Sequence, residues 1–328
     1  MRAIILLVTV CAWSAIAGEK PMLVRLAEHT GMCDASAGAA LSEKLFLAVN
    51  DEDNTLRVYR NDTGGPPVSE LNLDAFLEVQ GSSLESDLEG LAQIGKRIFV
   101  IGSHGLNREG KERFNRHRFF AFDAETNSKG VTIRPAGTPC KTLLDQLLRD
   151  PRVSPFKLAS ASTRAPKEPN ALNIEGLTST PEGHLLICFR NPVSEGKALL
   201  IPLMNPEEVI SEKAPKFGDP IRLNLGGLGI RDIARWQGRY FIIAGPYHGG
   251  GPFHFFTWKG PGHNPKRVKT EKLKDLHPEA VVIYPERGLR EVQILCDDGN
   301  RLLYGRPCKQ LRGLGKFRSM WLDFHQED

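Results

Sequence analysis

Residues 89–101, Glu-Gly-Leu-Ala-Gln-Ile-Gly-Lys-Arg-Ile-Phe-Val-Ile, place an acidic residue at the head of a short motif and an apolar run from Ile98 onward. The same arrangement occurs five times along the chain. The acidic residues that open the copies are Asp34, Glu89, Glu175, Asp232 and Glu279. Consecutive copies start 55, 86, 57 and 47 residues apart. A period near 50 residues with several strand signals per copy predicts the blades of a β-propeller.

The segments that follow the first apolar run of each copy are also strand-like. Candidates for a third strand are residues 56–59, 118–122, 198–201, 253–258 and 301–304. Candidates for an outer fourth strand are residues 68–73, 131–134 and 220–225. Residues 22–27 and 320–324 are expected to complete the last blade and close the ring. The sequence therefore predicts an all-β protein, a β-propeller of five or six four-stranded blades with one short helical insertion.

The interval of 86 residues has room for that insertion. Thr138-Pro139 precede a short amphipathic segment in which Leu143, Leu144, Leu147 and Leu148 share one side, and Pro151 ends it. Residues 151–170 are rich in Pro, Ser and Ala and predict a surface loop. We expect one propeller domain over residues 18–328, with the insertion at about 138–170.

The first seventeen residues have the features of a secretory signal peptide. Arg2 supplies a positive charge, residues 3–13 are apolar, and Ala15-Ile16-Ala17 form a small-x-small cleavage signal before Gly18. The apolar run is shorter than the roughly 20 residues that a spanning helix needs. We therefore expect residues 1–17 to be removed and the product to be secreted or periplasmic, with no transmembrane segment.

Cleavage would remove Cys11 and leave an odd number of cysteines, so not all of them can pair within one chain. Cys188 and Cys296 lie in apolar strand-like runs and are expected to be buried thiols. The remaining three, Cys33, Cys140 and Cys308, lie in turn-rich sequence, which predicts one disulfide among them. No spacing typical of a zinc site occurs in the sequence.

The charge composition argues against a nucleic-acid-binding protein. The chain has 43 Lys and Arg against 39 Asp and Glu, and the two signs are interleaved rather than gathered in a basic stretch. We also expect the protein to be a monomer.

Hydrolysis through a nucleophilic serine is not favoured by the sequence. There is no Gly-x-Ser-x-Gly motif, and the neighbours Ser103 and His104 would point apart on an extended chain.

Strand geometry predicts a polar rim at one end of the channel. In a blade the start of the first strand and the end of the antiparallel second strand lie on the same face. The acids at these places are candidate metal ligands, with Ca²⁺ as the candidate cation: Glu89, Glu175, Asp232, Glu279 and Asp297. Polar side chains of the adjoining loops are candidate catalytic or ligand-binding groups: His104, Arg190 and His248. The basic residues 108–118 could attract a small anionic ligand.

Each of these candidates also has a structural interpretation. The repeated acids could accept hydrogen bonds from backbone N–H groups of the channel, or pair with Arg190 or Arg231. Residues 51–54, Asp-Glu-Asp-Asn, are typical of a hairpin turn and lack the glycine and the distal glutamate of an EF-hand loop. Asp297-Asp298-Gly299 is likewise typical of a tight turn.

Six separated motifs carry a family resemblance. They are Ser86-Asp-Leu-Glu-Gly-Leu-Ala, Ile101-Gly-Ser-His-Gly, Asn173-Ile-Glu-Gly-Leu, Phe189-Arg-Asn-Pro, Gly229-Ile-Arg-Asp-Ile-Ala and Cys296-Asp-Asp-Gly. Together they resemble the bacterial secreted family known as domain of unknown function 3616, over roughly residues 30–305. That family is distantly similar to phytase-like propellers, some of which act on phosphate esters with calcium. The resemblance implies a propeller and leaves the activity open.

Three functions remain open from the sequence. The first is a binding or scaffold propeller with a polar, acidic rim for a ligand or cation. The second is a metal-assisted hydrolase of an ester or phosphoester, in which the acids hold the cation and Arg190 or the basic residues bind the anion. The third is a lactonase-like, sugar-handling propeller. Bound metal distinguishes the second from the first, because only a metal-assisted hydrolase requires it.

Overall fold

The computed structural model describes residues 22–128, 130–269, 276–311 and 313–324, and five four-stranded antiparallel sheets make up most of this part of the chain. The first blade contains β2 (Ala37–Ser42), β3 (Leu45–Val49), β4 (Thr55–Arg60) and β5 (Ser69–Asn72). The second contains β6 (Leu88–Ile94), β7 (Arg97–Gly102), β8 (Phe119–Asn127) and β9 (Gly130–Cys140). The third contains β10 (Asn173–Ser179), β11 (Leu185–Ser194), β12 (Lys197–Leu203) and β13 (Ile221–Leu223).

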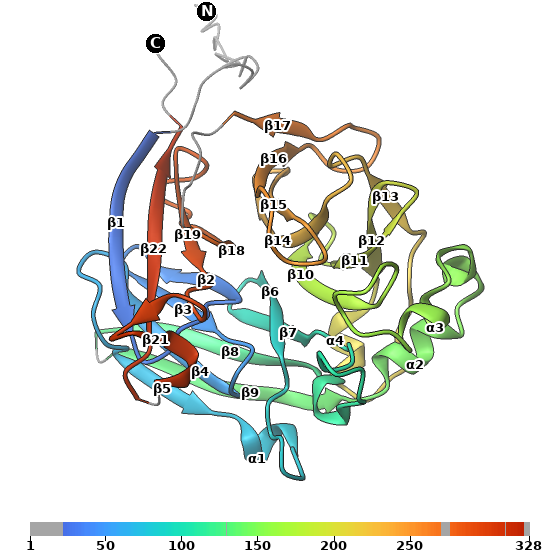
Figure 1. Cartoon of the computed structure of the whole chain (residues 1–328), viewed down its shortest axis with the longest axis horizontal. Coiled ribbons are helices and arrows are strands. Elements are labelled where there is room, and N and C mark those ends of the chain that lie inside the picture. Colours follow the sequence, from blue (N-terminus) through green and yellow to red (C-terminus); the bar gives the residue numbers. More distant parts are fainter. Residues whose placement is uncertain (1–21, 129, 270–275, 312, 325–328) are drawn as a thin grey trace, which may run out of the picture.

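The fourth and fifth blades complete the set. The fourth contains β14 (Gly229–Trp236), β15 (Arg239–Gly245), β16 (His254–Trp258) and β17 (Lys266–Val268). The fifth contains, from the inside outward, β18 (Pro278–Ile283), β19 (Glu291–Cys296), β22 (Lys316–Asp323) and β1 (Met22–Thr30). The innermost strands contact one another in the order β2, β6, β10, β14, β18 and back to β2, so the ring is closed around a central channel (Figure 1). The predicted propeller is confirmed, with five blades.

The two ends of the chain meet in the fifth blade. β1 from the N-terminal side pairs with β22 from the C-terminal side, as expected for the segments 22–27 and 320–324. The third strand predicted at residues 301–304 is wrong, because β22 takes that place. Instead Leu302–Leu303 (β20) and Arg306–Pro307 (β21) form a separate hairpin. Tyr304 and Gly305 between them have φ angles of 52° and 77°, which is the backbone of a tight hairpin turn.

The second strand of every blade is buried along almost its whole length, because both faces of its sheet pack against neighbouring blades. Its largest side chains include Phe46, Phe99, Phe189 and Phe241, each at most 1% exposed. Burial of one such side chain stabilises the fold by about 1.5–3 kcal/mol. These strands hold the channel-lining strands in position.

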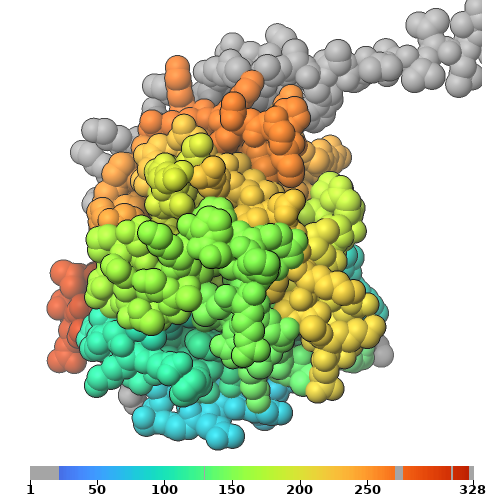
Figure 2. Space-filling view, turned by 90° about the vertical axis from the view of Figure 1, so that its right-hand side faces the viewer, coloured from blue at the N-terminus to red at the C-terminus, as the bar shows by residue number. Residues whose placement is uncertain are grey.

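The insertion lies on the outside of the second and third blades (Figure 2). It contains α2 (Leu143–Leu148), a 3₁₀ helix (Pro151–Phe156) and α3 (Leu158–Ala161). The surface loop predicted at residues 151–170 is therefore only partly correct. Val153 and Leu158 are buried in the same apolar cluster as residues of the second and third blades, and this packing favours helical turns. Two further short helices, α1 (Asp74–Leu77) and α4 (Pro206–Val209), lie in loops.

The cysteines follow the sequence expectation. Cys33 and Cys308 form a disulfide, whereas Cys140, Cys188 and Cys296 are free and the last two are buried. Cys11 and the predicted signal peptide lie outside the described residues. Within the described ranges, no helix has the length and apolar character that a bilayer crossing requires.

Candidate functional site

One end of the channel gathers the starts of the first strands and the loops that follow the second strands. The backbone N–H of Ser103 donates to the carbonyl of Asp87, and Asp34 forms an isolated bridge with Asp297. We call this end the charged mouth. Its residues are Asp34, Asp51, Glu52, Asp87, Glu89, Lys167, Glu175, Arg190, Arg231, Glu279 and Asp297. The structure thus brings together most of the acids that strand direction predicted to converge, but Asp232 is not one of them.

A register irregularity in the first strand of four blades decides which side chain faces the mouth. The irregularity lies at Glu89 in β6, at Glu175 in β10 and at Glu279 in β18. Such a bulge re-aims the side chain of the extra residue. In β14 it lies between Ile230 and Asp232, so the extra residue is Arg231. The repeat therefore puts an arginine, and not Asp232, at the fourth of these positions.

Asp232 is used between blades. Its carboxylate Oδ2 accepts a hydrogen bond of 2.7 Å from the backbone N–H of Val281 in β18. Burial raises the pKa of Asp232 to about 8. This is the structural role that the sequence analysis left open for the repeated acids, and it keeps Asp232 away from the other candidate ligands.

Glu175 and Glu279 are compensated by arginines, and we call this part of the mouth the compensated half. Arg190 forms an ion pair with Glu175 Oε1, and Arg231 Nη1 lies 2.9 Å from Glu175 Oε2. Arg231 also forms an ion pair with Glu279. All four residues are at most 9% exposed, and a carboxylate in such surroundings is stable only when it is paired.

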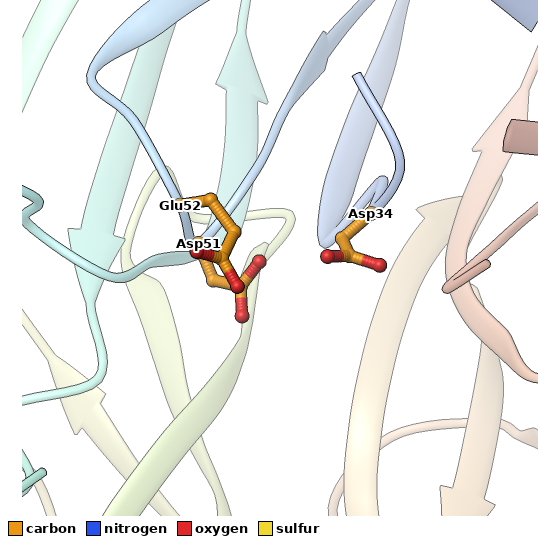
Figure 3. Close-up of side chains that lie close together, drawn as sticks. All are labelled: Asp34, Asp51 and Glu52. Atoms are coloured by element: carbon orange, nitrogen blue, oxygen red, sulfur yellow. The ribbon is translucent and has the colours of Figure 1, made fainter. Parts of the chain in front are cut away.

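Asp34, Asp51 and Glu52 lie opposite one another without such compensation, and we call them the acidic half (Figure 3). One oxygen atom from each of the three carboxylates lies within 4.8 Å of those of the other two. Asp34 is 6% exposed, and among the described residues its Oδ1 has no hydrogen-bond partner. The same holds for Oδ1 of Asp51. A buried carboxylate oxygen without a partner costs free energy unless something else satisfies it.

Burial and like charges act together on these acids. Burial, a hydrogen bond with Asp297 and the charge of that residue raise the pKa of Asp34 to about 10. Burial, followed by the charges of Asp87 and Glu52, raises the pKa of Asp51 well above its ordinary value. Carboxylates this close repel each other unless a proton or a cation lies between them.

Local turns explain why the acidic half has this shape. Asn50 Oδ1 accepts hydrogen bonds from the backbone N–H groups of Glu52 and Asp53, at 2.9 and 2.7 Å, so the predicted hairpin turn is confirmed. Asp53 is engaged by Arg57 at 2.8 Å, which leaves Asp51 and Glu52 as the acids of this turn that face the mouth. On the opposite side, the backbone N–H of Asp298 donates to the carbonyl of Cys33, the disulfide-bonded neighbour of Asp34.

Glu89 lies between the two halves. It is 9% exposed and has no hydrogen bond or ion pair with any residue that the structure describes. Burial raises the pKa of Glu89 well above its ordinary value, and the charges of Glu175, Asp87 and Asp51 act in the same direction. Burial and these like charges thus favour the protonated form of its carboxyl group.

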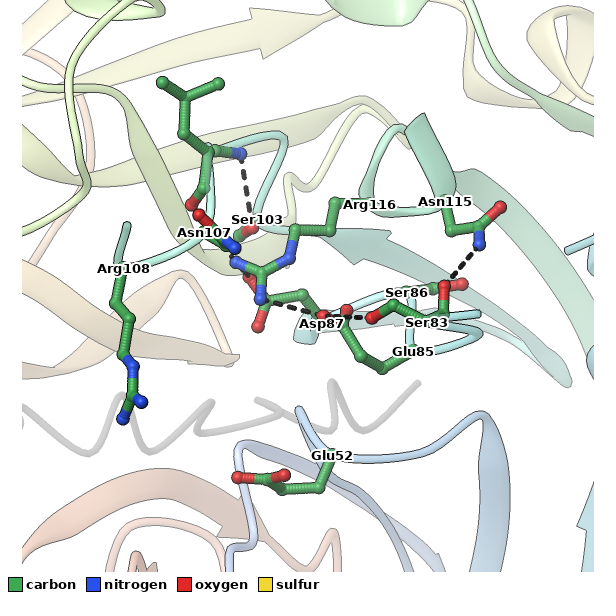
Figure 4. A network of polar contacts seen from close by, with 12 residues as sticks. Glu52, Ser83, Glu85, Ser86, Asp87, Ser103, Asn107, Arg108, Asn115 and Arg116 are labelled. Carbon is green, nitrogen blue, oxygen red and sulfur yellow. Dashed lines mark hydrogen bonds and ion pairs between the residues drawn. The ribbon is translucent and has the colours of Figure 1, made fainter. Parts of the chain in front are cut away.

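The second blade contributes an ion-pair network around Arg116 and Asp87 (Figure 4). Arg116 pairs with Asp87 at 2.8 Å and with Glu85 at 3.0 Å. Arg118 is 4% exposed and donates to the carbonyl of Leu77 at 2.8 Å. Arg116 and Arg118 of the basic residues 108–118 are therefore occupied in structural contacts. Arg108, which pairs with Glu109 at 2.6 Å, extends toward Glu52 in the same view.

The two histidine candidates have different surroundings. His104 is 2% exposed, its Nδ1 lies 2.9 Å from the carbonyl of Gly102, and its Nε2 is buried without a partner among the described residues. Burial, with a smaller effect of His117, lowers the pKa of His104 to about 3, so its ring is neutral. His248 is exposed, and its Nδ1 contacts the carbonyl of Gly249. The structure does not bring the two histidines together.

Several mouth residues were not candidates from the sequence. Asp34 was recognised as a repeat head, and Asp51 and Glu52 as a turn, but their approach to one another depends on ring closure. Lys167 was assigned to a surface loop. One feature of the sequence could have indicated Asp51 and Glu52 as site residues. Residues 51–53 are all acidic and follow the end of a second strand, on the predicted rim.

The opposite end of the channel opens into a recess of 530 Å³. Its lining includes Gln93, Ser179, Arg235, Trp236 and Glu286. None of the candidate site residues lies there, so the two ends of the channel differ in chemistry.

Comparisons with known proteins identify the family of this chain. The chain is similar to glutaminyl cyclase of Myxococcus xanthus, at 12% identity over 92% of this chain and 96% of that chain, with a TM-score of 0.43. It is also similar to the PQQ-bound aldose sugar dehydrogenase of Streptomyces coelicolor, at 12% identity over 93% and 98% of the chains, with a TM-score of 0.46. At this identity and score neither match bears on the chemistry of this chain. No curated protein matches.

A family model matches residues 34–119 and 123–287, which include every mouth residue except Asp297. These two ranges make up more than half of the chain and cover the first four blades and the start of the fifth. The model is described as Protein of unknown function (DUF3616), and the chain belongs to this family.

Proposed function

We propose that this protein is a secreted or periplasmic binding propeller whose charged mouth holds a divalent cation, Ca²⁺, on Asp34, Asp51 and Glu52. The observation that carries the proposal is the buried Oδ1 of Asp34, which has no partner among the described residues and belongs to a three-carboxylate group. Ca²⁺ takes about six to eight oxygen ligands in flexible geometry, and carboxylates from separate loops suit it better than they suit the strict octahedron of Mg²⁺.

The compensated half supports this assignment by contrast. The charges of Glu175 and Glu279 are already neutralised by Arg190 and Arg231, so a cation there would compete with two guanidinium groups. In the acidic half no Lys or Arg pairs with Asp34 or Asp51 among the described residues. A cation would therefore enter where the negative charge is least compensated.

A calcium titration by calorimetry tests the proposal. Wild-type protein is expected to bind one Ca²⁺, and D34N is expected to bind it at least about tenfold more weakly, which corresponds to roughly 1.4 kcal/mol. E43Q is the matched control, because Glu43 is an acid in the turn between β2 and β3, at the opposite end of the same blade. Absence of a calcium signal in wild-type protein, or equal affinities of D34N and E43Q, would refute the proposal.

A metal-assisted ester or phosphoester hydrolase is the second candidate. The observation that favours it is Glu89, a buried carboxyl group next to the acidic half whose raised pKa suits it to donate a proton to a leaving group. E89Q should then abolish calcium-dependent hydrolysis of a nitrophenyl ester or phosphate while leaving the calcium affinity unchanged. Wild-type protein that is inactive on both substrates with calcium bound would leave the binding propeller as the function.

A further inference from the structure

Lys167 extends from the insertion toward the charged mouth, and its position is built by the fold. Asn191, which is fully buried at 0% exposure, donates its Nδ2 to the carbonyls of Pro166 and Glu168, at 3.0 and 2.7 Å. These two residues flank Lys167, so a buried side chain fixes the backbone on both sides of it. The side chain of Lys167 is itself exposed, and a ligand can reach it.

The ammonium group of Lys167 lies over a glycine loop. Its Nζ is 3.5 Å from the position that a Cβ on Gly249 would occupy. Gly249, Gly250 and Gly251 have φ angles of 74°, 69° and 115°, which glycine adopts without strain. The loop therefore runs close to the lysine without side chains that would cover it.

The surroundings of Lys167 are predominantly positive. Partial burial lowers the pKa of Lys167, and the charges of Arg190, Arg231 and Lys309 act in the same direction. Asp297, at the edge of the acidic half, is the acid that opposes them. Lys167 forms no ion pair or hydrogen bond of its side chain with any described residue.

Arg231, in the same region, has a hydrogen-bond donor that is not used by any described residue. It is 9% exposed, and its Nε is buried without a partner among the described residues. Glu175 and Glu279 together neutralise Arg190 and Arg231, so the charge of Lys167 is left over. Lys167 and Lys309 thus place positive charge at the edge of the mouth next to the acidic half, where Asp297 opposes them.

We propose that Lys167 is the anchor of an oxyanion subsite, which binds the phosphate or carboxylate group of a small molecule at the charged mouth. The inference rests on the proposed function, because the oxyanion would lie between Lys167 and the cation held by the acidic half. Oxygen atoms of such an anion are ligands that Ca²⁺ accepts, and an ammonium group binds them by charge-assisted hydrogen bonds. The natural ligand is therefore an anionic small molecule.

Titration with two simple anions tests the subsite. Methyl phosphate and acetate are titrated separately into calcium-loaded and calcium-free protein by calorimetry, at fixed ionic strength, with glycerol as the neutral comparison. K167M is expected to weaken binding of the preferred anion about tenfold or more, and K167R to retain most of it. K44M is the matched control, because Lys44 is an exposed lysine in the turn between β2 and β3, at the other end of the channel.

The outcomes separate the two claims. Binding of methyl phosphate alone identifies a phosphate subsite, and binding of acetate alone identifies a carboxylate subsite. Equal anion affinities of K167M and K44M would overturn the subsite, as would wild-type protein that binds neither anion at millimolar concentration. If calcium does not bind but K167M still loses anion affinity in calcium-free protein, the proposed function fails and the subsite stands.

Discussion

Both halves of the charged mouth contain buried carboxyl groups, which are paired with arginines in the compensated half and are not paired with any described arginine or lysine in the acidic half. In the compensated half, Glu175 and Glu279 share Arg231, which the bulge of β14 places where β6, β10 and β18 have a glutamate. In the acidic half, Asp34 and Asp51 face each other with buried oxygens that have no partner among the described residues. The comparison shows that a repeated carboxylate gains its role from the charge that the neighbouring blade supplies.

Removal of the shared arginine should have the largest effect on stability. R231M leaves Glu175 with Arg190 alone and removes the arginine that pairs with Glu279, and breaking a buried ion pair from one side costs about 3–5 kcal/mol. We expect the free energy of unfolding, measured by denaturant titration without calcium, to fall by this amount. A loss below about 1 kcal/mol would mean that the two halves do not differ in compensation.

Asp232, which lies outside the charged mouth, should make the free energy of unfolding depend on pH. The pKa of Asp232 is raised to about 8, so the folded protein retains a proton that the unfolded chain releases near pH 4. The contribution of Asp232 to stability is therefore largest at low pH and is lost as the pH rises toward 8. In D232N the free energy of unfolding should lack this decline of about 1.4 kcal/mol per pH unit between about pH 5 and 7. Parallel curves for D232N and wild-type protein would contradict the assignment.

Calcium should change the stability of the protein more than removal of one charge from the acidic half does. D51N removes one of several repelling carboxylates, so we expect its stability without calcium to stay within about 1 kcal/mol of wild type. Calcium at a hundred times its dissociation constant should stabilise wild-type protein by about 2.7 kcal/mol and D51N by much less. Thermal melts with chelator and with calcium measure both quantities. If D51N lost much of its stability in chelator, Asp51 would instead have a structural role like that of Glu175.

The smallest effect concerns the disulfide that lies next to Asp34. The Cys33–Cys308 bond ties the start of the first blade to the hairpin that follows Asp297, so its reduction should loosen the acidic half and weaken calcium binding a few fold without affecting the Glu175 ion pairs. Unreduced, denatured protein that lacks residues 1–17 should show three reactive thiols, from Cys140, Cys188 and Cys296. Five thiols would mean that the disulfide is absent.

The repeat with its acidic heads was sufficient to predict the blades, their second strands and the end of the channel at which polar groups gather. It was not sufficient to predict that Asp232 turns into the blade interface, because one bulged residue in β14 moves Arg231 into its place. Bulges depend on pairing with the second strand and leave no clear trace in composition. The proximity of Asp34 and Asp51 could also not be predicted from the sequence, because the distance between them is set by how five blades close the ring.

Lys167 and the segment 301–304 illustrate the same limit. Lys167 is positioned by Asn191, which lies 24 residues further along the chain, and nothing near Lys167 in the sequence indicates this contact. The strand-like segment 301–304 turns back at Tyr304 and Gly305, and the last blade takes its third strand from β22 instead. In both cases a tertiary contact overrides the local pattern.

A crystal structure of protein grown with calcium, with an anomalous difference map, locates the cation directly. We expect one peak in the acidic half, with oxygen atoms of Asp34, Asp51 and Glu52 at about 2.3–2.6 Å from it. A peak between Glu175 and Glu279, or no peak at the charged mouth in millimolar calcium, would contradict the claim that uncompensated charge selects the cation site.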